Sequence, residues 1–161
     1  MASQSRKSSK KHLKHYALPT MPNRGTYVLV IHLPSSRRTR FGSLGYRELD
    51  KGYYVYVGSG RRHLVRRVAR HLRKHKPLRW HIDYITSPPE TRPVQLTLTG
   101  RVGLECSLSS RLADDGKALP RIGSSDCGCT SHLIYFPNMR RVKKAVQKAF
   151  HILKPVQTIK L

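Results

Sequence analysis

The sequence is short of acidic residues, and that shortage is its strongest compositional feature. Its 161 residues include 8 Asp and Glu against 32 Lys and Arg, which gives a formal net charge of +24. A compact body with this charge repels itself, so a polyanionic partner stabilises it. Nucleic acid is the commonest such partner because each neutralised phosphate releases a condensed counterion, although an anionic membrane surface or an acidic protein would also serve.

Three further absences narrow the class of protein. No apolar run approaches about 18 residues, so we expect no membrane-spanning helix and no membrane partner. The basic N-terminus is not followed by an apolar segment, so we expect no secretory signal. There are three cysteines, and an odd count with Cys127 and Cys129 close together is not typical of a disulfide framework. We therefore expect a cytoplasmic protein with reduced thiols.

Length and composition predict one domain with two basic extensions. Residues 1–23 are rich in Ser, Lys and His and contain no acid, so we expect a disordered tail there. Such a tail serves either as a nucleic-acid arm or as a solubilising or targeting segment. Residues 24–136 form the predicted domain, and residues 137–161 a basic amphipathic helix packed on it. The sequence does not specify an oligomeric state.

Short β-branched and alternating segments, interleaved with helical patterns, predict an α/β fold of the α+β kind: a small antiparallel sheet flanked by helices. Strands are predicted over residues 26–32, 41–49, 53–57, 80–86, 94–99 and 131–136. Helices are predicted over residues 62–75, 103–113 and 138–153, and turns or loops over residues 34–40 and 116–130. Asn138 is the expected N-cap of the last helix.

The predicted helix over residues 62–75 is strongly basic and contains no acid. Like charges one turn apart oppose helix formation by roughly a few tenths of a kcal/mol per pair, so a face of one sign indicates an anionic partner. The candidate nucleic-acid-binding residues are Arg61, Arg62, Arg66, Arg70, Arg73 and Lys74. Gly58-Ser59-Gly60 precedes this helix, where free amides and the positive end of the helix dipole can meet a phosphate. The same glycines also suit a plain tight turn.

Several short motifs follow one another along the chain. Gly25-Thr26-Tyr27 begins one predicted strand, and Tyr56-Val57-Gly58 ends another. The basic helix comes next, and LECSLS with Glu105 and DCGCTSH at residues 126–132 follow it. In this order the motifs resemble the GIY-YIG nuclease superfamily, over about residues 25–136. The closest resemblance is to a prokaryotic branch of uncharacterised proteins, some of them fused to endonuclease III-like enzymes.

The resemblance implies an endonuclease that cleaves phosphodiester bonds, in DNA rather than RNA, with one divalent metal ion such as Mg²⁺ or Mn²⁺. It places Tyr27 and Tyr56 along the site, one of them activating or orienting the attacking water. Arg67 would neutralise charge on the scissile phosphate, since a guanidinium binds two phosphate oxygens at once. Glu105 would hold the metal through a carboxylate oxygen. His71 would orient water or contact phosphate.

The resemblance is incomplete, and other functions fit the composition. Many family members place an Asn late in the domain against the metal or phosphate. The chain has no equivalent, because Asn138 lies beyond the expected region. One alternative is a non-catalytic nucleic-acid-binding module on the same fold. Another, suggested by the basic tail, is a structural protein associated with RNA or the ribosome.

Each candidate catalytic residue also has a structural interpretation. Tyr27 and Tyr56 lie in predicted strands, where tyrosine is common in any protein. Glu105 can pair with one of the many arginines. His71 falls within the apolar stripe of its helix and can simply pack there.

The second candidate site contains soft metal ligands. Cys127, Cys129 and His132 have the spacing C-x-C-x-x-H, which supplies three ligands where a structural Zn²⁺ site normally uses four. Asp126, Cys106 or His81 would complete the set if the fold brings one of them close. Buried thiols without a metal are the simpler interpretation. In the predicted strand over residues 80–86, His81 and Asp83 would share a face and can form a hydrogen-bonded pair.

Overall fold

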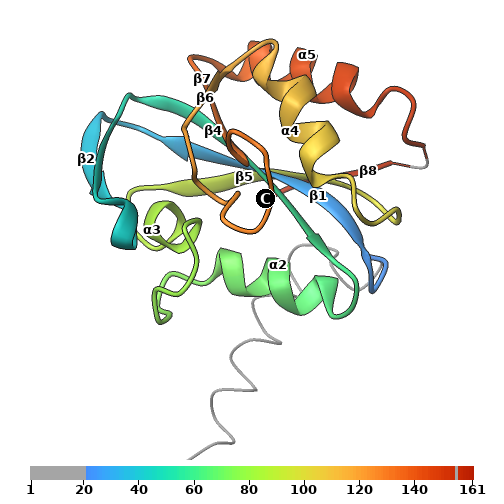
Figure 1. Ribbon diagram of the computed structural model, residues 1–161, viewed down its shortest axis with the longest axis horizontal. Helices are drawn as coiled ribbons and strands as arrows, with labels where there is room; N and C mark the ends of the chain where they lie inside the picture. Colours follow the sequence, from blue (N-terminus) through green and yellow to red (C-terminus); the bar gives the residue numbers. More distant parts are fainter. Residues whose placement is uncertain (1–20, 155) are drawn as a thin grey trace, which may run out of the picture.

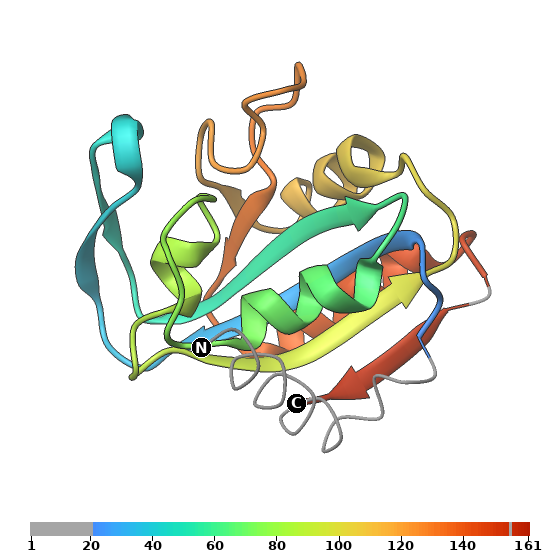
Figure 2. The same ribbon diagram turned by 90° about the horizontal axis from the view of Figure 1, so that it is seen from below.

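The computed structural model describes residues 21–154 and 156–161, which form a central sheet with helices on both faces (Figures 1 and 2). The sheet has six antiparallel strands in the order β6-β7-β4-β1-β5-β8. These strands are β1 (Gly25–Leu33), β4 (Gly52–Gly60), β5 (Arg92–Thr99), β6 (Lys117–Ala118), β7 (Leu133–Phe136) and β8 (Gln157–Lys160). The predicted fold class is confirmed.

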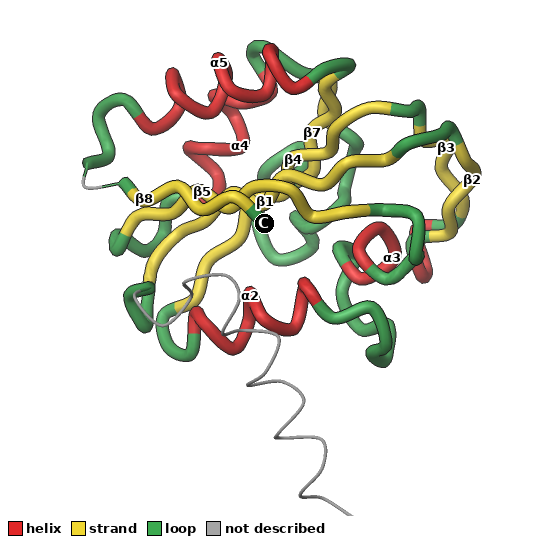
Figure 3. Tube along the Cα trace, turned by 180° about the vertical axis from the view of Figure 1, so that it is seen from behind, coloured by secondary structure: helices red, strands yellow, loops and turns green. Residues whose placement is uncertain are grey.

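The remaining elements flank this sheet. Helices α4 and α5 cover one face, and α2 and α3 cover the other (Figure 1). The helices are α2 (Leu64–Leu72), α3 (Asp83–Thr86), α4 (Glu105–Ala113) and α5 (Met139–Phe150). A separate hairpin joins β2 (Arg37–Arg40) to β3 (Tyr46–Leu49) through a short 3-10 turn, Gly42–Leu44, and projects beyond one end of the sheet (Figure 3).

Strand β1 lies in the middle of the sheet and separates two apolar cores. It pairs with β4 on one side and β5 on the other. Because successive side chains alternate between faces, Tyr27 and Leu29 join the core under α2 and α3, whereas Val28 and Val30 join the core under α4 and α5. These β1 residues are completely buried, so the strand positions both helical layers.

The C-terminal helix starts where it was predicted to start, but it is shorter than predicted. The Asn138 side chain accepts a hydrogen bond from the Arg141 amide at 3.0 Å, as an N-cap should. Helix α5 then ends at Phe150, and residues 157–160 form the edge strand β8 against β5. The prediction of a helix alone over residues 137–161 is therefore wrong. Strand β8 has only four residues, and pairing with β5 determines its structure.

Two other local predictions are wrong for related reasons. Residues 80–86 form a turn and the short helix α3 rather than a strand. The Asp83 carboxylate accepts hydrogen bonds from the amides of Arg79 and Trp80, both at 2.9 Å, and thereby holds the chain in a turn. Residues 37–40, expected in a turn, form β2 because they pair with β3.

The basic helix begins later than predicted, and its start is capped from elsewhere in the chain. The Asn23 carbonyl accepts from the Leu64 amide at 3.0 Å, and its side chain accepts from the His63 amide at 3.1 Å. Met21 is also buried, so ordered contacts begin before the predicted boundary at residue 24. The expected disordered tail otherwise lies outside the described residues. These two amides are bonded to Asn23 and are not free to meet a phosphate, whereas Gly58, Ser59 and Gly60 line a cavity described below.

A buried ion pair fastens α3 to α2. Asp83 is fully buried and accepts from both Arg70 Nη atoms, at 2.6 and 2.9 Å. Burial alone would raise the pKa of Asp83, but the Arg70 and backbone hydrogen bonds outweigh it, so that pKa is lowered. The Lys76 ammonium is also buried and lies 3.8 Å from the carboxylate. Burial lowers the pKa of Lys76 to about 8, although Asp83 acts against that shift.

We predict that Asp83→Asn destabilises the protein by about 3 kcal/mol, because it leaves buried cations without their counter-charge. The measurement is urea unfolding at neutral pH. The matched control is Asp115→Asn, whose partner Lys148 is exposed on α5, and we expect about 0.5 kcal/mol or less there. Equal effects of the two substitutions would contradict the role assigned to Asp83.

Candidate active site and sulfur cluster

A basic cavity of about 730 Å³ lies beside the end of β4, between α2 and the start of α4. Its basic lining residues are Arg61, Arg62, Arg67 and Arg79. Two carboxylates, Glu105 and Asp126, also line it, together with Tyr56, Ser59 and Trp80. The cavity is therefore positively charged and has a small acidic patch.

Three of the predicted catalytic residues meet in this cavity, and two do not. Tyr56, Arg67 and Glu105 are lining residues, whereas Tyr27 and His71 lie behind the wall. The prediction that both tyrosines line the site is wrong for Tyr27, which is fully buried and makes a 2.7 Å hydrogen bond to His71 Nε2.

The register of β1 and β4 explains why Tyr27 is buried. Tyr27 lies opposite Gly58, and its ring occupies the space that a side chain at position 58 would fill. A Cβ on Gly58 would come 2.5 Å from the Tyr27 hydroxyl. The glycine of the second motif is therefore required by packing and not by a tight turn alone.

His71 is a packed neutral imidazole. It is fully buried, and its Nδ1 atom has no hydrogen-bond partner within the part of the chain that the structure describes. Burial, reinforced by the nearby Lys76 charge, lowers the pKa of His71 to about 3. The prediction that it contacts phosphate or the attacking water is wrong. Its ring contacts the Tyr27 hydroxyl and lies steeply inclined to the Tyr56 and Trp80 rings.

Tyr56 supplies the phenol of the cavity wall. Burial raises its pKa to about 12, and the Arg67 charge acts in the opposite direction. The phenol is consequently protonated at neutral pH and can both donate and accept a hydrogen bond.

Arg67 lies on the cavity side of α2, and an aromatic ring supports it. Its guanidinium lies 5.0 Å from the Trp80 ring centroid, and the Arg70 guanidinium lies 4.4 Å from the same ring. No ion pair of Arg67 occurs among the described residues. Trp80 was not among the predicted site residues. As the only tryptophan, located just after a basic helix, it could have been noticed.

Glu105 is the first residue of α4 and accepts a close hydrogen bond from the Ser59 hydroxyl on β4. The positive end of the helix dipole favours a carboxylate at this position. Within the described part of the chain neither Glu105 nor Asp126 forms an ion pair, so the ion-pair interpretation of Glu105 is not borne out. The cavity thus offers oxygen ligands of the kind that hard divalent cations prefer.

The basic residues in α2 and on either side of it divide into two sets. Arg61, Arg62, Arg66 and Arg73 are exposed. Arg70 and Lys74 are turned into the protein: Arg70 pairs with Asp83, and the Lys74 ammonium donates to the carbonyls of Thr86, Pro88 and Thr91. We therefore assign Arg70 and Lys74 to the fold, which corrects their prediction as nucleic-acid-binding residues.

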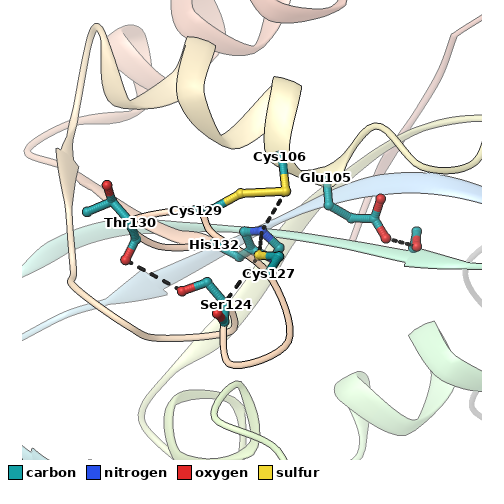
Figure 4. Close-up of a disulfide and its surroundings, with 8 residues drawn as sticks. Glu105, Cys106, Ser124, Cys127, Cys129, Thr130 and His132 are labelled. Carbon is teal, nitrogen blue, oxygen red and sulfur yellow. Dashed lines mark hydrogen bonds between the residues drawn. A yellow bond between two sulfur atoms is a disulfide. The ribbon is translucent and has the colours of Figure 1, made fainter.

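Beside the cavity, the second predicted site is assembled with a fourth member. The ligand atoms of Cys106, Cys127, Cys129 and His132 all lie within 4.8 Å of one another (Figure 4). These four residues, here called the sulfur cluster, could bind a metal such as zinc. Cys106 and Cys129 are joined as a disulfide, contrary to the prediction of reduced thiols, and Cys127 is free.

The two other candidates for the fourth ligand, His81 and Asp126, are not part of the sulfur cluster. His81 Nδ1 accepts from the Gly123 amide at 3.0 Å and does not pair with Asp83, so the predicted His81–Asp83 pair is wrong. Asp126 lines the cavity.

The fold and the site define a small α+β domain in which a phenol, a guanidinium and a carboxylate share one basic cavity. No helix among the described residues is both long and apolar enough to cross a membrane. The sequence matches the domain of unknown function DUF123 over residues 26–155. The chain belongs to this GIY-YIG-like family. No curated protein and no solved structure matches the chain.

The buried His71 predicts a pH dependence of stability. Its pKa is lowered in the folded state, so unfolding takes up a proton once the pH falls below the unfolded value near 6.5. Stability from this group is present above that pH and decreases as the pH falls, by about 1.4 kcal/mol per pH unit. Between pH 6.5 and 4.5 we expect the stability difference between wild type and His71→Gln to shift by about 2 kcal/mol against the wild type.

The measurement is denaturant unfolding of both proteins at several pH values. His151→Gln serves as the control, since His151 is exposed at the end of α5. A wild-type to His71→Gln difference that stays constant with pH would show that His71 is not neutral in the folded protein.

Proposed function

We propose that this protein is a metal-dependent endonuclease that cleaves phosphodiester bonds in DNA. One observation carries the proposal: Tyr56, Arg67 and Glu105, distant in the sequence, line a single basic cavity. The order of motifs that resembles the GIY-YIG superfamily supports the same function, and LECSLS and DCGCTSH favour its prokaryotic branch. The preference for DNA and the cytoplasmic location rest on sequence alone.

The residues present fit Mg²⁺ or Mn²⁺. Glu105 and Asp126 both offer carboxylate oxygens to the cavity, and neither forms an ion pair among the described residues. Glu105 would hold the ion, with Asp126 as the second acidic group nearby. When bound, such an ion supplies Lewis-acid stabilisation of charge on the phosphate and the leaving oxygen.

The other residues act on the substrate directly or through a neighbour. The Arg67 guanidinium binds two non-bridging phosphate oxygens and offsets the charge that grows on them. The protonated Tyr56 hydroxyl orients the attacking water by a hydrogen bond. Tyr27 and His71 do not touch the substrate. They hold α2 against β1, and therefore they position Arg67.

Nucleic acid approaches along the exposed cations beside the cavity. Arg61 and Arg62 line it and are exposed, and Arg66 and Arg73 extend the basic surface along α2. Trp80 also lines the cavity and is 38% exposed, with the Arg67 and Arg70 guanidinium groups over its ring.

A non-catalytic binding module on the same fold is the alternative, and one observation favours it. The late Asn found in many family members has no counterpart at the cavity. Asn138, the only asparagine after Asn23, is occupied as the N-cap of α5. A binder would keep the basic surface and lack turnover.

We predict that Glu105→Gln and Arg67→Ala each reduce Mg²⁺- or Mn²⁺-dependent cleavage by about 100-fold or more, because each removes charge that stabilises the transition state. Cleavage of single-stranded, duplex and branched DNA is the measurement. The matched controls are Glu48→Gln on β3 and Arg140→Ala on α5, both exposed and distant from the cavity, and cleavage should be unchanged in them. DNA binding by Glu105→Gln should persist.

If metal-loaded wild-type protein binds all three substrates and cuts none, the endonuclease is excluded and the binding module remains. If it cuts and Glu105→Gln cuts equally well, the assignment of Glu105 fails.

Affinity for DNA should fall steeply with salt, because binding releases counterions from the phosphates. Replacing Arg61 with Ala should make the slope of log affinity against log salt shallower by about 0.9, the value for one lost phosphate contact on duplex DNA. The measurement is fluorescence anisotropy across a salt series. Arg140→Ala, on the opposite face of the sheet, should leave the slope unchanged. An unchanged slope in Arg61→Ala would remove this residue from the interface.

A further inference from the structure

The sulfur cluster holds more ligands than a disulfide needs. The Cys106–Cys129 bridge joins α4 to the loop before β7 and uses two of the four side chains. The other two converge on the same point: Cys127 Sγ lies 3.5 Å from His132 Nε2, and Cys106 Sγ lies 3.9 Å from it. A free thiol and an imidazole directed at a disulfide contribute nothing to that bond, whereas both are ligands for a thiophilic metal.

We propose that in the reduced chain Cys106, Cys127, Cys129 and His132 bind one Zn²⁺ as a structural Cys₃His site. This inference goes beyond the nuclease proposal and does not depend on it. Each cysteine binds as a thiolate, so binding of Zn²⁺ releases the thiol protons to solvent.

The geometry fits a tetrahedral zinc centre. With Zn–S bonds of about 2.3 Å, ligand atoms in a tetrahedron lie about 3.8 Å apart. The two distances above are of this size, and the whole set lies within 4.8 Å.

The location explains what a structural ion would do. Between β6, which ends at Ala118, and β7, which starts at Leu133, the chain forms no helix or strand. Three of the ligands come from this loop, and the fourth is the second residue of α4. The ion would therefore tie the loop to the helix that carries Glu105. Figure 4 shows Cys106 turned toward the sulfur cluster and the neighbouring Glu105 turned toward β4.

The sulfur cluster and the cavity would bind different ions. Three thiolates and Zn²⁺ give a centre with a net charge of −1, which does not attract phosphate. Glu105 and Asp126 offer hard oxygen ligands, whereas the cluster offers soft sulfur. The two acidic residues therefore suit Mg²⁺ or Mn²⁺, and zinc prefers the cysteines.

The test uses the full chain purified with a phosphine reductant, which reduces the disulfide to two thiols while the phosphine takes oxygen from water. Metal analysis by mass spectrometry should find about one Zn²⁺ per chain, as expected for a closed four-ligand site. In Cys127→Ser the zinc content should fall to about one tenth or less, because only three ligands remain. Cys127 is the informative position because it does not belong to the disulfide.

Controls and a second readout keep the result interpretable. Glu105→Gln and His151→Gln should retain zinc, and His132→Gln should lose it. In the wild type, replacement of zinc by Co²⁺ should give the intense visible bands of a tetrahedral ion and near-ultraviolet thiolate charge-transfer bands. This second measurement holds even if a cysteine variant fails to fold.

Two results would overturn the proposal. One is a reduced, folded chain with three titratable thiols and no zinc or cobalt binding. The other is equal zinc in wild type and Cys127→Ser, which would show that the ion binds elsewhere. If the zinc-loaded wild-type protein cleaves no DNA, the nuclease assignment is contradicted and the zinc site is unaffected.

Discussion

The contact between Tyr27 and Gly58 determines where the rest of the site can lie. The two residues face each other across β1 and β4, and the phenol ring occupies the space that a side chain at position 58 would need. The Tyr27 hydroxyl then reaches His71 on α2. This hydrogen bond acts together with the packing of Leu64 and Val68 in the same core to fix how the helix lies. Arg67, one turn before His71, consequently faces the cavity.

The basic side chains near the cavity do not all have the same role. Arg70 and Lys76 converge on Asp83, the one acid that is completely buried among the described residues. This pairing keeps α3 against α2 and brings Trp80 under Arg67 and Arg70. A buried ion pair is weak evidence for stability, but it fixes geometry, since leaving any member unpaired is costly. The structure thus uses part of its excess charge to position the residues that remain exposed.

Sequence patterns predicted the elements whose structure is local and missed those that depend on a partner. Strands β1 and β4 and helix α5 follow from β-branched runs, amphipathic spacing and the Asn138 cap. The turn at residues 80–83 instead depends on Asp83 meeting Arg70, and strand β8 depends on β5. The spacing of apolar residues along the sequence contains no information about contacts between such distant segments.

The candidate site shows the same division. The ordered motifs predicted Tyr56, Arg67 and Glu105 together, because a shared order along one chain implies a shared fold. They could not distinguish Tyr56, at the cavity, from Tyr27, behind it, since both are strand tyrosines. That difference arises from which tyrosine faces Gly58. The sulfur cluster was predicted with three ligands and with Asp126, Cys106 or His81 as the possible fourth, and the fold selects Cys106 by placing α4 beside the loop before β7.

A site for both a phosphodiester and a divalent cation must solve an electrostatic problem. Its guanidinium and its carboxylate attract each other, and an ion pair between them would neutralise both. Here Glu105, at the start of α4, is held by the Ser59 hydroxyl, and Arg67 is held against the Trp80 ring. Each charged group has a neutral partner that fixes its position without cancelling its charge. In a chain with four times as many cations as acids, Glu105 and Asp126 remain outside every described ion pair, which is the arrangement that a cation-binding site requires.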